Sequence, residues 1–410
     1  MLRTILHYCN IFGLLWTLCL CLVNIALPHW VLMIGLYIFF ATWLTEMVIE
    51  RRWHVKPTKE WIFYGLLLVF FLWAFLYWPW DGQHTYFRHH IEQRLPLLGF
   101  GIIGLFGINR HYSRAIIINT MIAVSVLSVL YITTMAGWKQ VLSSPVRWWF
   151  FSVARTKYVN AHMWYNFFLN STLIGIWYLL FHAERKPALW QKITYPVATV
   201  LIIASLLISE GRSGFFTAVA LLGMMLIIEC YKRIKWLGIT MGVMTVAAVI
   251  AISATHPRIS KEELTDDLRY AYWKSAAELI VERPVLGYGI SRAQEEFDQV
   301  NTKYADKFMD YLGPIRTTHY IDCHNQYIQT TMEFGIVGLI ILLAIYLAPL
   351  VICWGKREWW LAFFFTLISM GQSLFDMFLT GRFNMLYCIF LLMILSIKDD
   401  YSLSPTPREA

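Results

Sequence analysis

The feature that most constrains the fold of this chain is a series of apolar runs, each close in length to a membrane-spanning helix. A bilayer core requires about 20 mostly apolar residues per helix, because the backbone groups must be hydrogen-bonded within the segment. The chain is 58% apolar and only 15% charged, whereas a soluble domain is about 45–50% apolar. The sequence therefore predicts an all-α, polytopic membrane protein. The twelve runs are 11–27, 30–49, 61–78, 96–108, 115–135, 163–182, 195–209, 214–229, 236–254, 328–350, 359–378 and 383–397.

The basic residues test this arrangement, because cytoplasmic connections of membrane proteins are enriched in Lys and Arg. With a cytoplasmic N-terminus, the connections expected inside are all basic, and twelve crossings return the C-terminus to the cytoplasm. The net charge of +8 then follows from topology and does not indicate binding of nucleic acid. We expect the first run to be a retained span, since it lacks a signal-peptide cleavage site. The inner connections are 50–59, 110–114, 185–192, 232–235 and 356–357, and the short outer turns are 28–29, 81–94, 210–212 and 380–382.

Two connections on the expected outer side are long. The segment 136–162 carries Trp and basic residues, which predicts a segment lying on the outer leaflet. The polar stretch between the ninth and tenth runs predicts a loop domain with helices at 261–281 and 290–308. The predicted organisation is therefore nine transmembrane helices in 1–254, an outer loop domain in 255–323, three transmembrane helices in 324–397 and a cytoplasmic tail in 398–410.

Three ionisable side chains fall on the expected outer side: Arg212, Arg269 and His324. Arginine offers a planar fork of donors that matches phosphate oxygens, and histidine can accept a proton near neutrality. Together they could hold a diphosphate leaving group while a base activates a hydroxyl group. Gly214 would let a phosphate approach the backbone beside Arg212. The plainer alternatives are a snorkelling Arg212, a solvated Arg269 and a His324 bound to backbone at a helix start.

Other polar residues give weaker indications. Arg382, in the last outer turn, is another phosphate candidate, although snorkelling to lipid headgroups is the favoured explanation. Arg292 is expected to be a surface charge. His84, His89 and His90 lie close together, but they lack the carboxylate and the spacing of a metal site. The seven Cys show no paired spacing, so we expect neither a disulfide nor a bound metal.

Several sequence blocks in a fixed order make this chain resemble the bacterial O-antigen ligase and polymerase family. The resemblance covers roughly 205–350, and the first half of the chain is similar only in being hydrophobic. The blocks are Ser-Glu-Gly-Arg-Ser-Gly at 209–214, the stretch from Arg269 to Trp273, and Glu-Arg-Pro-Val-Leu-Gly-Tyr-Gly at 282–289. Last come His-Asn-Gln-Tyr-Ile-Gln at 324–329 and Glu-Phe-Gly-Ile-Val-Gly at 333–338.

The resemblance implies a metal-independent, inverting glycosyltransferase that needs no cofactor. It implies a GT-C-like fold of about 12 transmembrane helices and one large periplasmic helical loop, at the bacterial inner membrane. The donor would be an O-polysaccharide on undecaprenyl diphosphate, and the acceptor would be lipid A–core. Carried over residue by residue, Arg212 and Arg269 would bind the diphosphate and His324 would be the catalytic base. Candidate supporting residues are Glu210, Tyr327, Glu333 and Arg382, and Arg292 competes with Arg269 in the alignment.

Two other functions stay open at this point. An O-antigen polymerase would share the donor chemistry but would extend a second carrier-linked glycan. The single long loop after the ninth run, closed by the block at 324–329, favours the ligase. A transporter or flippase of lipid-linked glycans would need polar residues through the membrane depth, often in two related halves. Here the ionisable groups gather at one face, and Asp376 near a span end has no evident partner.

Overall fold

The structure is a computed structural model, and it describes residues 2–20, 29–51, 57–80, 84–108, 113–136, 162–208, 212–255, 268–305 and 322–397. Within these ranges the chain forms helices joined by short turns, without a β-strand. This agrees with the predicted all-α class. Residues 137–161 of the predicted interfacial segment and the tail at 398–410 lie outside the described residues.

A helix overlaps each of the twelve predicted apolar runs. In the described part of the chain, five helices are long and apolar enough to cross a membrane: Glu60–Trp80, Arg114–Thr134, Leu189–Leu207, Gly214–Arg233 and Gln326–Ile352. The crossing of a membrane by the other helices stays a prediction. The twelve helices are α1 (Leu2–Leu20), α2 (His29–Ile49), α3 (Glu60–Phe75), α4 (His84–Phe106), α5 (Arg114–Ala136), α8 (His162–Phe181), α9 (Leu189–Ile208), α10 (Arg212–Arg233), α11 (Lys235–Thr255), α16 (Gln326–Ile352), α17 (Trp359–Gln372) and α18 (Gly381–Ser396).

One predicted outer turn is wrong. The stretch 81–94 was expected to be a turn because it is polar, but α4 begins at His84 and continues through Pro96. Tyr86, Phe87 and Arg94 are all buried, so this polar stretch packs one face against the rest of the molecule. Hydropathy cannot detect such a helix, because its exposed face lowers the average over the whole segment.

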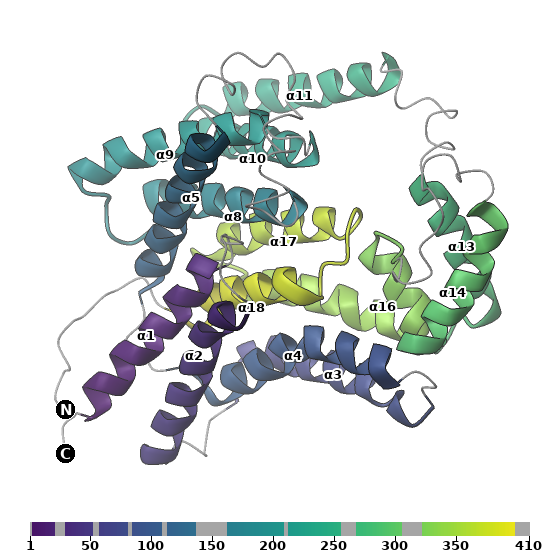
Figure 1. The fold of residues 1–410 in the computed structure, drawn as a ribbon. Helices are drawn as coiled ribbons and strands as arrows, with labels where there is room; N and C mark the ends of the chain where they lie inside the picture. Colours follow the sequence, from purple (N-terminus) through teal and green to yellow (C-terminus); the bar gives the residue numbers. More distant parts are fainter. Residues whose placement is uncertain are drawn as a thin grey trace.

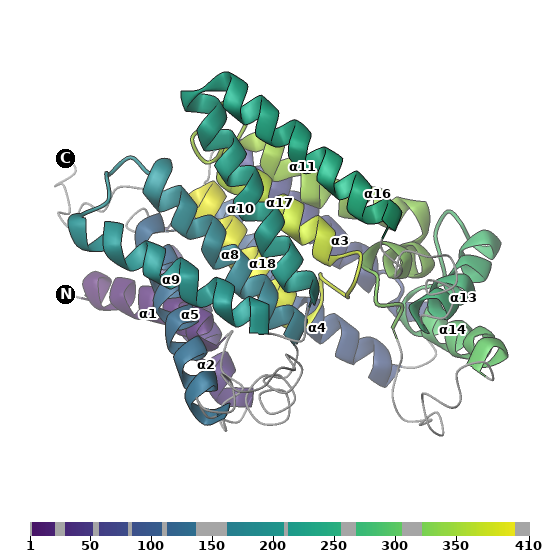
Figure 2. The same cartoon turned by 90° about the horizontal axis from the view of Figure 1, so that it is seen from above.

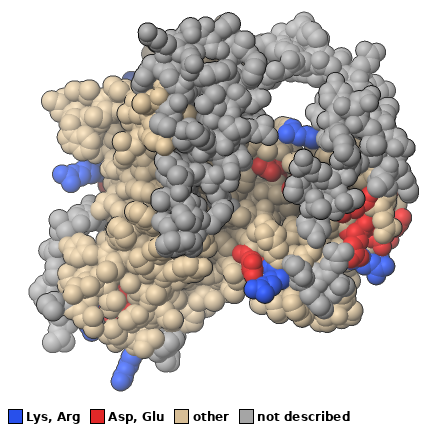
Figure 3. Space-filling model, in the orientation of Figure 1, with Lys and Arg blue, Asp and Glu red and all other residues tan. Residues whose placement is uncertain are grey.

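Helix α16 lies at the centre of the arrangement, between α3 on one side and α17 on the other (Figure 1). Helix α18 packs on α4, and α8 packs on α17, α10 and α5. Two further helices, α13 (Leu268–Glu282) and α14 (Ile290–Ala305), form the predicted loop domain. They pack on each other and on α16 at one end of the bundle (Figure 2). Most of the acidic side chains on the face drawn in Figure 3 gather at this end.

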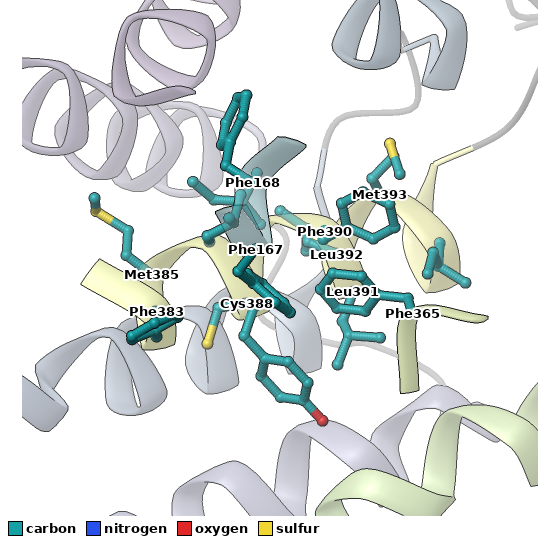
Figure 4. Close-up of a cluster of buried hydrophobic side chains, with 14 of the residues drawn as sticks. Phe167, Phe168, Phe365, Phe383, Met385, Cys388, Phe390, Leu391, Leu392 and Met393 are labelled. Atoms are coloured by element: carbon teal, nitrogen blue, oxygen red, sulfur yellow. The ribbon is translucent and has the colours of Figure 1, made fainter. Parts of the chain in front are cut away.

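Aromatic side chains fill the centre of the bundle (Figure 4). Phe365 of α17 stacks on Phe390 of α18 with ring centroids 3.9 Å apart. Phe167 of α8 contacts Phe383 of α18 with centroids 5.8 Å apart. Almost every residue of α18 from Phe383 to Ile394 is buried. A helix that is apolar on all sides is stable only in such an interior, and α18 therefore serves as the core around which its neighbours pack.

Contacts between connections agree with the predicted alternation of the helices. At one end, Lys356 Nζ, in a connection predicted inside, lies 3.1 Å from Oε1 of Glu60, the first residue of α3, which directly follows the inner connection predicted at 50–59. At the other end, Tyr86 Oη donates to Gln294 Oε1 at 2.8 Å, and both belong to segments predicted outside. Each contact thus joins two segments that are predicted to lie on the same side of the membrane. Which end faces the cytoplasm stays a prediction.

Helix α16 breaks at Gly335, where φ is 64° and ψ is −164°. Residues 284–289, called the strap below, cross the break and connect α13 to α14. Backbone hydrogen bonds join the strap to both sides of the break, so the groups freed by the kink are paired. These bonds run from Ile336 N to Pro284 O (2.8 Å), Tyr288 N to Met332 O (3.1 Å) and Gly289 N to Glu333 O (2.8 Å). Two of the sequence blocks, 282–289 and 333–338, therefore form one structural unit.

Two glycines allow the strap to approach so closely. A Cβ atom on Gly335 would lie 2.1 Å from Val285 O, and one on Gly287 would lie 2.6 Å from the carbonyl carbon of Glu333. Gly287 also has a φ of 69°. The backbone region that Gly335 occupies is essentially restricted to glycine. Both glycines are thus required by backbone contact and conformation.

We predict that Gly335→Ala destabilises the protein by at least about 2 kcal/mol, because the new Cβ adds a backbone clash to a strained conformation. The matched control is Gly223→Ala in α10, where a Cβ atom would meet nothing within 4 Å. That control should be neutral or stabilising by about 0.5–1 kcal/mol. Thermal unfolding in detergent measures both. Equal melting temperatures for the two variants would show that the strap does not sit on the kink.

Candidate active site at the start of helix α16

The block at 324–329 begins α16 with a side-chain cap. Asn325 Oδ1 accepts hydrogen bonds from Tyr327 N at 3.0 Å and from Ile328 N at 3.1 Å. Asparagine is among the favoured residues at this position because its side chain pairs the free N–H groups of the first turn. The cap leaves His324 as the residue immediately before the helix.

The rest of the block attaches α16 to the connection between α17 and α18. Gln326 N donates to Ser373 O at 2.8 Å, and Leu379 N donates to Gln326 Oε1 at 2.8 Å. Tyr327 Oη donates to Met370 O at 2.9 Å. Tyr327, predicted as a supporting residue, is therefore tied to α17. These contacts hold the start of α16 against its neighbour and leave the imidazole of His324 outside the packing.

The backbone of His324 has a φ of 45°, which is uncommon for a residue other than glycine. Such a conformation costs about 1–3 kcal/mol and persists only where its surroundings enforce it. Two contacts enforce it here. His324 N donates to Asp322 Oδ1 at 2.8 Å, and Trp273 Nε1 of α13 donates to Cys323 O at 3.1 Å. The loop domain and α16 together therefore fix the backbone of this residue.

The imidazole of His324 has one buried edge and one exposed edge. Its Nδ1 atom lies 3.2 Å from Asp322 Oδ1 and is shielded from solvent. The side chain as a whole is 42% exposed, so the edge that carries Nε2 faces outward. The ring of Tyr272 lies nearby, with centroids 6.2 Å apart. An accessible imidazole nitrogen of this kind can take a proton from a bound hydroxyl group.

Beneath His324, a chain of buried polar contacts runs into the bundle. Cys323 N donates to Gln329 Oε1 at 3.2 Å, and Gln329 Nε2 donates to Glu333 Oε1 at 2.9 Å. Arg94 Nη2 of α4 donates to Glu333 Oε2 at 2.7 Å, and both of these side chains are 1% exposed. Removing one partner of a buried ion pair is strongly destabilising, since it leaves the other charge unpaired. The pair therefore ties α4 to the kink of α16.

Glu333 was expected to orient the catalytic groups, but the residues that it contacts directly are Arg94 and Gln329. It reaches His324 only through Gln329 and the backbone of Cys323. Arg94 was not recognised as a site residue because it seemed to belong to an exposed turn. Its place at the start of an apolar run could have indicated a buried partner, since an ionisable group in such a position is costly to leave unpaired.

A charged group from the connection between α17 and α18 completes the site. Burial raises the pKa of the Asp376 carboxyl to about 7, and the negative charge of Asp322 raises it as well. The positive charge of Arg269 and a hydrogen bond from Met377 N oppose this rise. Asp376 thus lies within electrostatic reach of α13 and of the loop before α16. In the sequence, only its position near the end of an apolar run, without an evident partner, indicated that Asp376 could belong to a site.

The structure separates the two competing arginines. Arg269, in the first turn of α13, is partly buried and lies close enough to Asp376 for its charge to lower the pKa of that carboxyl. Arg292 lies on α14 with its Nε atom 3.7 Å from Glu296 Oε1, and its side chain is 51% exposed. Of these two arginines, Arg269 is the one whose charge reaches Asp376, and its binding of a diphosphate stays a prediction.

The other candidate residues are placed only by their backbones. Arg212 is the first residue of α10 and Arg382 the second residue of α18, and their side chains lie outside the described part, as does all of Glu210. Asn170 Nδ2 of α8 donates to Gly214 O at 3.1 Å. A Cβ atom on Gly214 would lie 2.5 Å from Asn166. Gly214, expected to admit a phosphate, therefore makes room for α8.

Helix α8 connects the start of α10 to the rest of the site. Asn166 abuts Gly214, and the next residue, Phe167, contacts Phe378 with ring centroids 5.0 Å apart. Phe378 lies two residues after Asp376 in the connection between α17 and α18. The start of α10 and this connection therefore flank the same turn of α8, which places the backbone of Arg212 at the same end of the bundle as His324.

The O-antigen ligase family model matches residues 197–343. This match supports assigning the chain to the O-antigen ligase family. It confirms the resemblance predicted from the sequence blocks, and the matched region extends from α9 into α16. The residues that the O-antigen ligase family model covers include Arg212, Arg269 and His324. No protein of curated function matches the chain significantly.

We predict that Asp376→Asn changes how stability depends on pH. The carboxyl of Asp has an ordinary pKa of about 3.9, and in the folded protein it is raised to about 7. Between these values the folded state binds a proton that the unfolded state releases, so rising pH destabilises the wild type. The variant cannot ionise, and its advantage in melting temperature should grow between pH 4.5 and pH 7 and then level off.

The matched control is Glu92→Gln, which removes an exposed carboxylate that pairs with Arg88 on α4. An exposed pair contributes little to stability, so the melting temperature of this control should follow that of the wild type at every pH. A constant difference between Asp376→Asn and the wild type across this range would contradict the prediction.

Proposed function

We propose that this protein is an O-antigen ligase. It transfers an O-polysaccharide from undecaprenyl diphosphate onto lipid A–core at the periplasmic face of the bacterial inner membrane. The observation that carries the proposal is the convergence of Arg269 and the loop of His324, from α13 and the start of α16, inside the region matched by the O-antigen ligase family model. A cation and a base at one end of the bundle are the groups that this reaction needs.

In the proposed reaction, Nε2 of His324 removes the proton of an acceptor hydroxyl group. The oxygen attacks the anomeric carbon of the donor sugar from the face opposite the diphosphate, and the bond between that carbon and the diphosphate oxygen breaks. The diphosphate leaves with the bonding electron pair, and the new glycosidic bond has inverted configuration. The guanidinium groups of Arg269 and Arg212 stabilise the charge that develops on the leaving diphosphate.

The position of the site suits substrates carried by lipids. His324 lies at the very start of α16, which is long and apolar enough to cross a membrane. A carrier lipid in the bilayer would present its diphosphate at this level. The buried pair of Arg94 and Glu333 lies deeper along α16, but both side chains are 1% exposed. A sealed ion pair lines no passage for a substrate, which favours a transferase over a transporter.

The decisive experiment compares the purified wild type with His324→Asn. Both receive undecaprenyl-diphosphate O-polysaccharide and lipid A–core. Asparagine tolerates a positive φ better than most residues, so this variant should keep its melting temperature while it loses the base. We expect transfer to fall by at least about 100-fold, in line with the contribution of a general base.

Each alternative predicts a different outcome. Transfer by a folded His324→Asn within a few-fold of the wild type would exclude His324 as the base. Longer polysaccharide without modified lipid A–core would indicate a polymerase. Movement of the intact donor across a vesicle membrane, without any covalent product, would indicate a transporter.

We also predict that Arg269→Ala lowers transfer by about 10²–10³-fold, because it removes a donor to the leaving group. The matched variant is Arg292→Ala, whose side chain is exposed beside Glu296. Transfer by that variant should stay within a few-fold of the wild type. Initial rates at saturating donor measure both. The reverse order of effects would show that Arg292 contacts the diphosphate.

A further inference from the structure

The carboxylate of Asp322 contacts two different parts of His324. Its Oδ1 atom accepts the backbone N–H of His324 at 2.8 Å, and the same atom lies 3.2 Å from Nδ1 of the ring. The first contact closes a local turn of the kind that Asp side chains commonly form. The second brings a negative charge against one edge of the imidazole. One short side chain thus controls both the backbone and the ring of this residue.

This arrangement determines which ring nitrogen is available. Nδ1 is shielded from solvent and makes no hydrogen bond in the structure, but it lies 3.2 Å from Asp322 Oδ1, so a small rotation of the ring lets an Nδ1–H group donate to this carboxylate. The proton of the neutral ring then sits on Nδ1, and the lone pair is on Nε2. Because the side chain is 42% exposed, Nε2 is the nitrogen that a substrate can reach. A carboxylate that orients histidine in this way is a recurring device of general bases.

Other ionisable groups lie near this pair. Asp376, in the connection between α17 and α18, lies within electrostatic reach of Asp322 and of Arg269 on α13. Tyr272, also on α13, lies beside the ring, and burial raises the pKa of its hydroxyl above the ordinary value. Tyr272 is therefore neutral near pH 7. Asp322 is the charged group that is in direct contact with the imidazole.

We propose that Asp322 is the positioning residue of His324. It holds the ring with Nδ1–H toward Oδ1, and it stabilises the imidazolium that forms when Nε2 takes the proton of the acceptor. In this step the O–H bond of the acceptor breaks and an N–H bond forms at Nε2. The proton later leaves Nε2 through the exposed edge of the ring. The inference rests on the proposed function of His324 as a base.

Two variants distinguish the effect of the negative charge of Asp322 from the effect of its hydrogen-bond acceptor. Asp322→Asn keeps an oxygen that can accept from His324 N and from Nδ1, but it removes the negative charge. Asp322→Ala removes both. We expect kcat to fall about tenfold in the first variant, since a contact to a charged group is lost. It should fall on the order of 100-fold in the second, and the KM for the donor should change little in either.

The matched control is Glu296→Gln, which removes a carboxylate of the same loop domain that pairs with Arg292. Its kcat should stay within about twofold of the wild type, because its side chain does not contact His324. Thermal unfolding accompanies each variant. A loss of transfer in Asp322→Asn with an unchanged melting temperature cannot be ascribed to unfolding.

A second measurement does not depend on transfer. Diethyl pyrocarbonate modifies imidazole nitrogen, and mass spectrometry of the peptide that contains His324 gives the rate of modification at a fixed pH. Because Asp322 is proposed to hold the ring with Nε2 outward, this rate should fall in Asp322→Asn. It should not change in Glu296→Gln.

The outcomes separate this inference from the proposed function. An unchanged rate of modification together with unchanged kcat in Asp322→Asn would overturn the positioning role and leave the proposed function intact. Transfer that persists in His324→Asn would overturn the proposed function, and with it any catalytic use of the contact. A lower rate of modification combined with a lower kcat in Asp322→Asn supports the inference.

Discussion

The structure depends on how the broken backbone of α16 is paired. An interrupted helix leaves N–H and C=O groups without partners, and within a membrane no water is present to satisfy them. The strap supplies these partners from the loop between α13 and α14. The same hydrogen bonds that complete α16 also attach the loop domain to the bundle. The loop domain is thus attached to α16 through the backbone, and its position follows from the geometry of the kink.

This attachment explains how a strained residue can stand at an exposed edge. His324 receives support from Trp273 on α13 and from the buried contacts that lead through Gln329 to Glu333 and Arg94. These supports come from α13, α16 and α4, which the strap and the ion pair hold together. A side chain whose backbone is fixed on several sides has little freedom to lose when a ligand binds, which would favour the reaction proposed for His324.

Much of the helical architecture could be predicted from the sequence, because a bilayer imposes a length on each apolar run. The start of α4 could not, since its polar face lowers the mean hydropathy of residues 84–94. The pairing of Arg94 with Glu333 joins residues 239 positions apart, and single-sequence patterns carry no information on such contacts. The blocks around Gly287 and Gly335 were visible, but their direct contact with each other was not. The importance of Asp322 depends on a ring orientation that only coordinates reveal.

The way the strap is attached also has a consequence for sequence divergence. Backbone hydrogen bonds do not depend on the identity of the side chains that project from them. The outer surfaces of α13 and α14 can therefore change from one relative to another while the loop domain keeps its place, provided that glycine remains at 287 and 335. For the glycosyl transfer proposed above, such a surface could change its contacts with a substrate without moving His324.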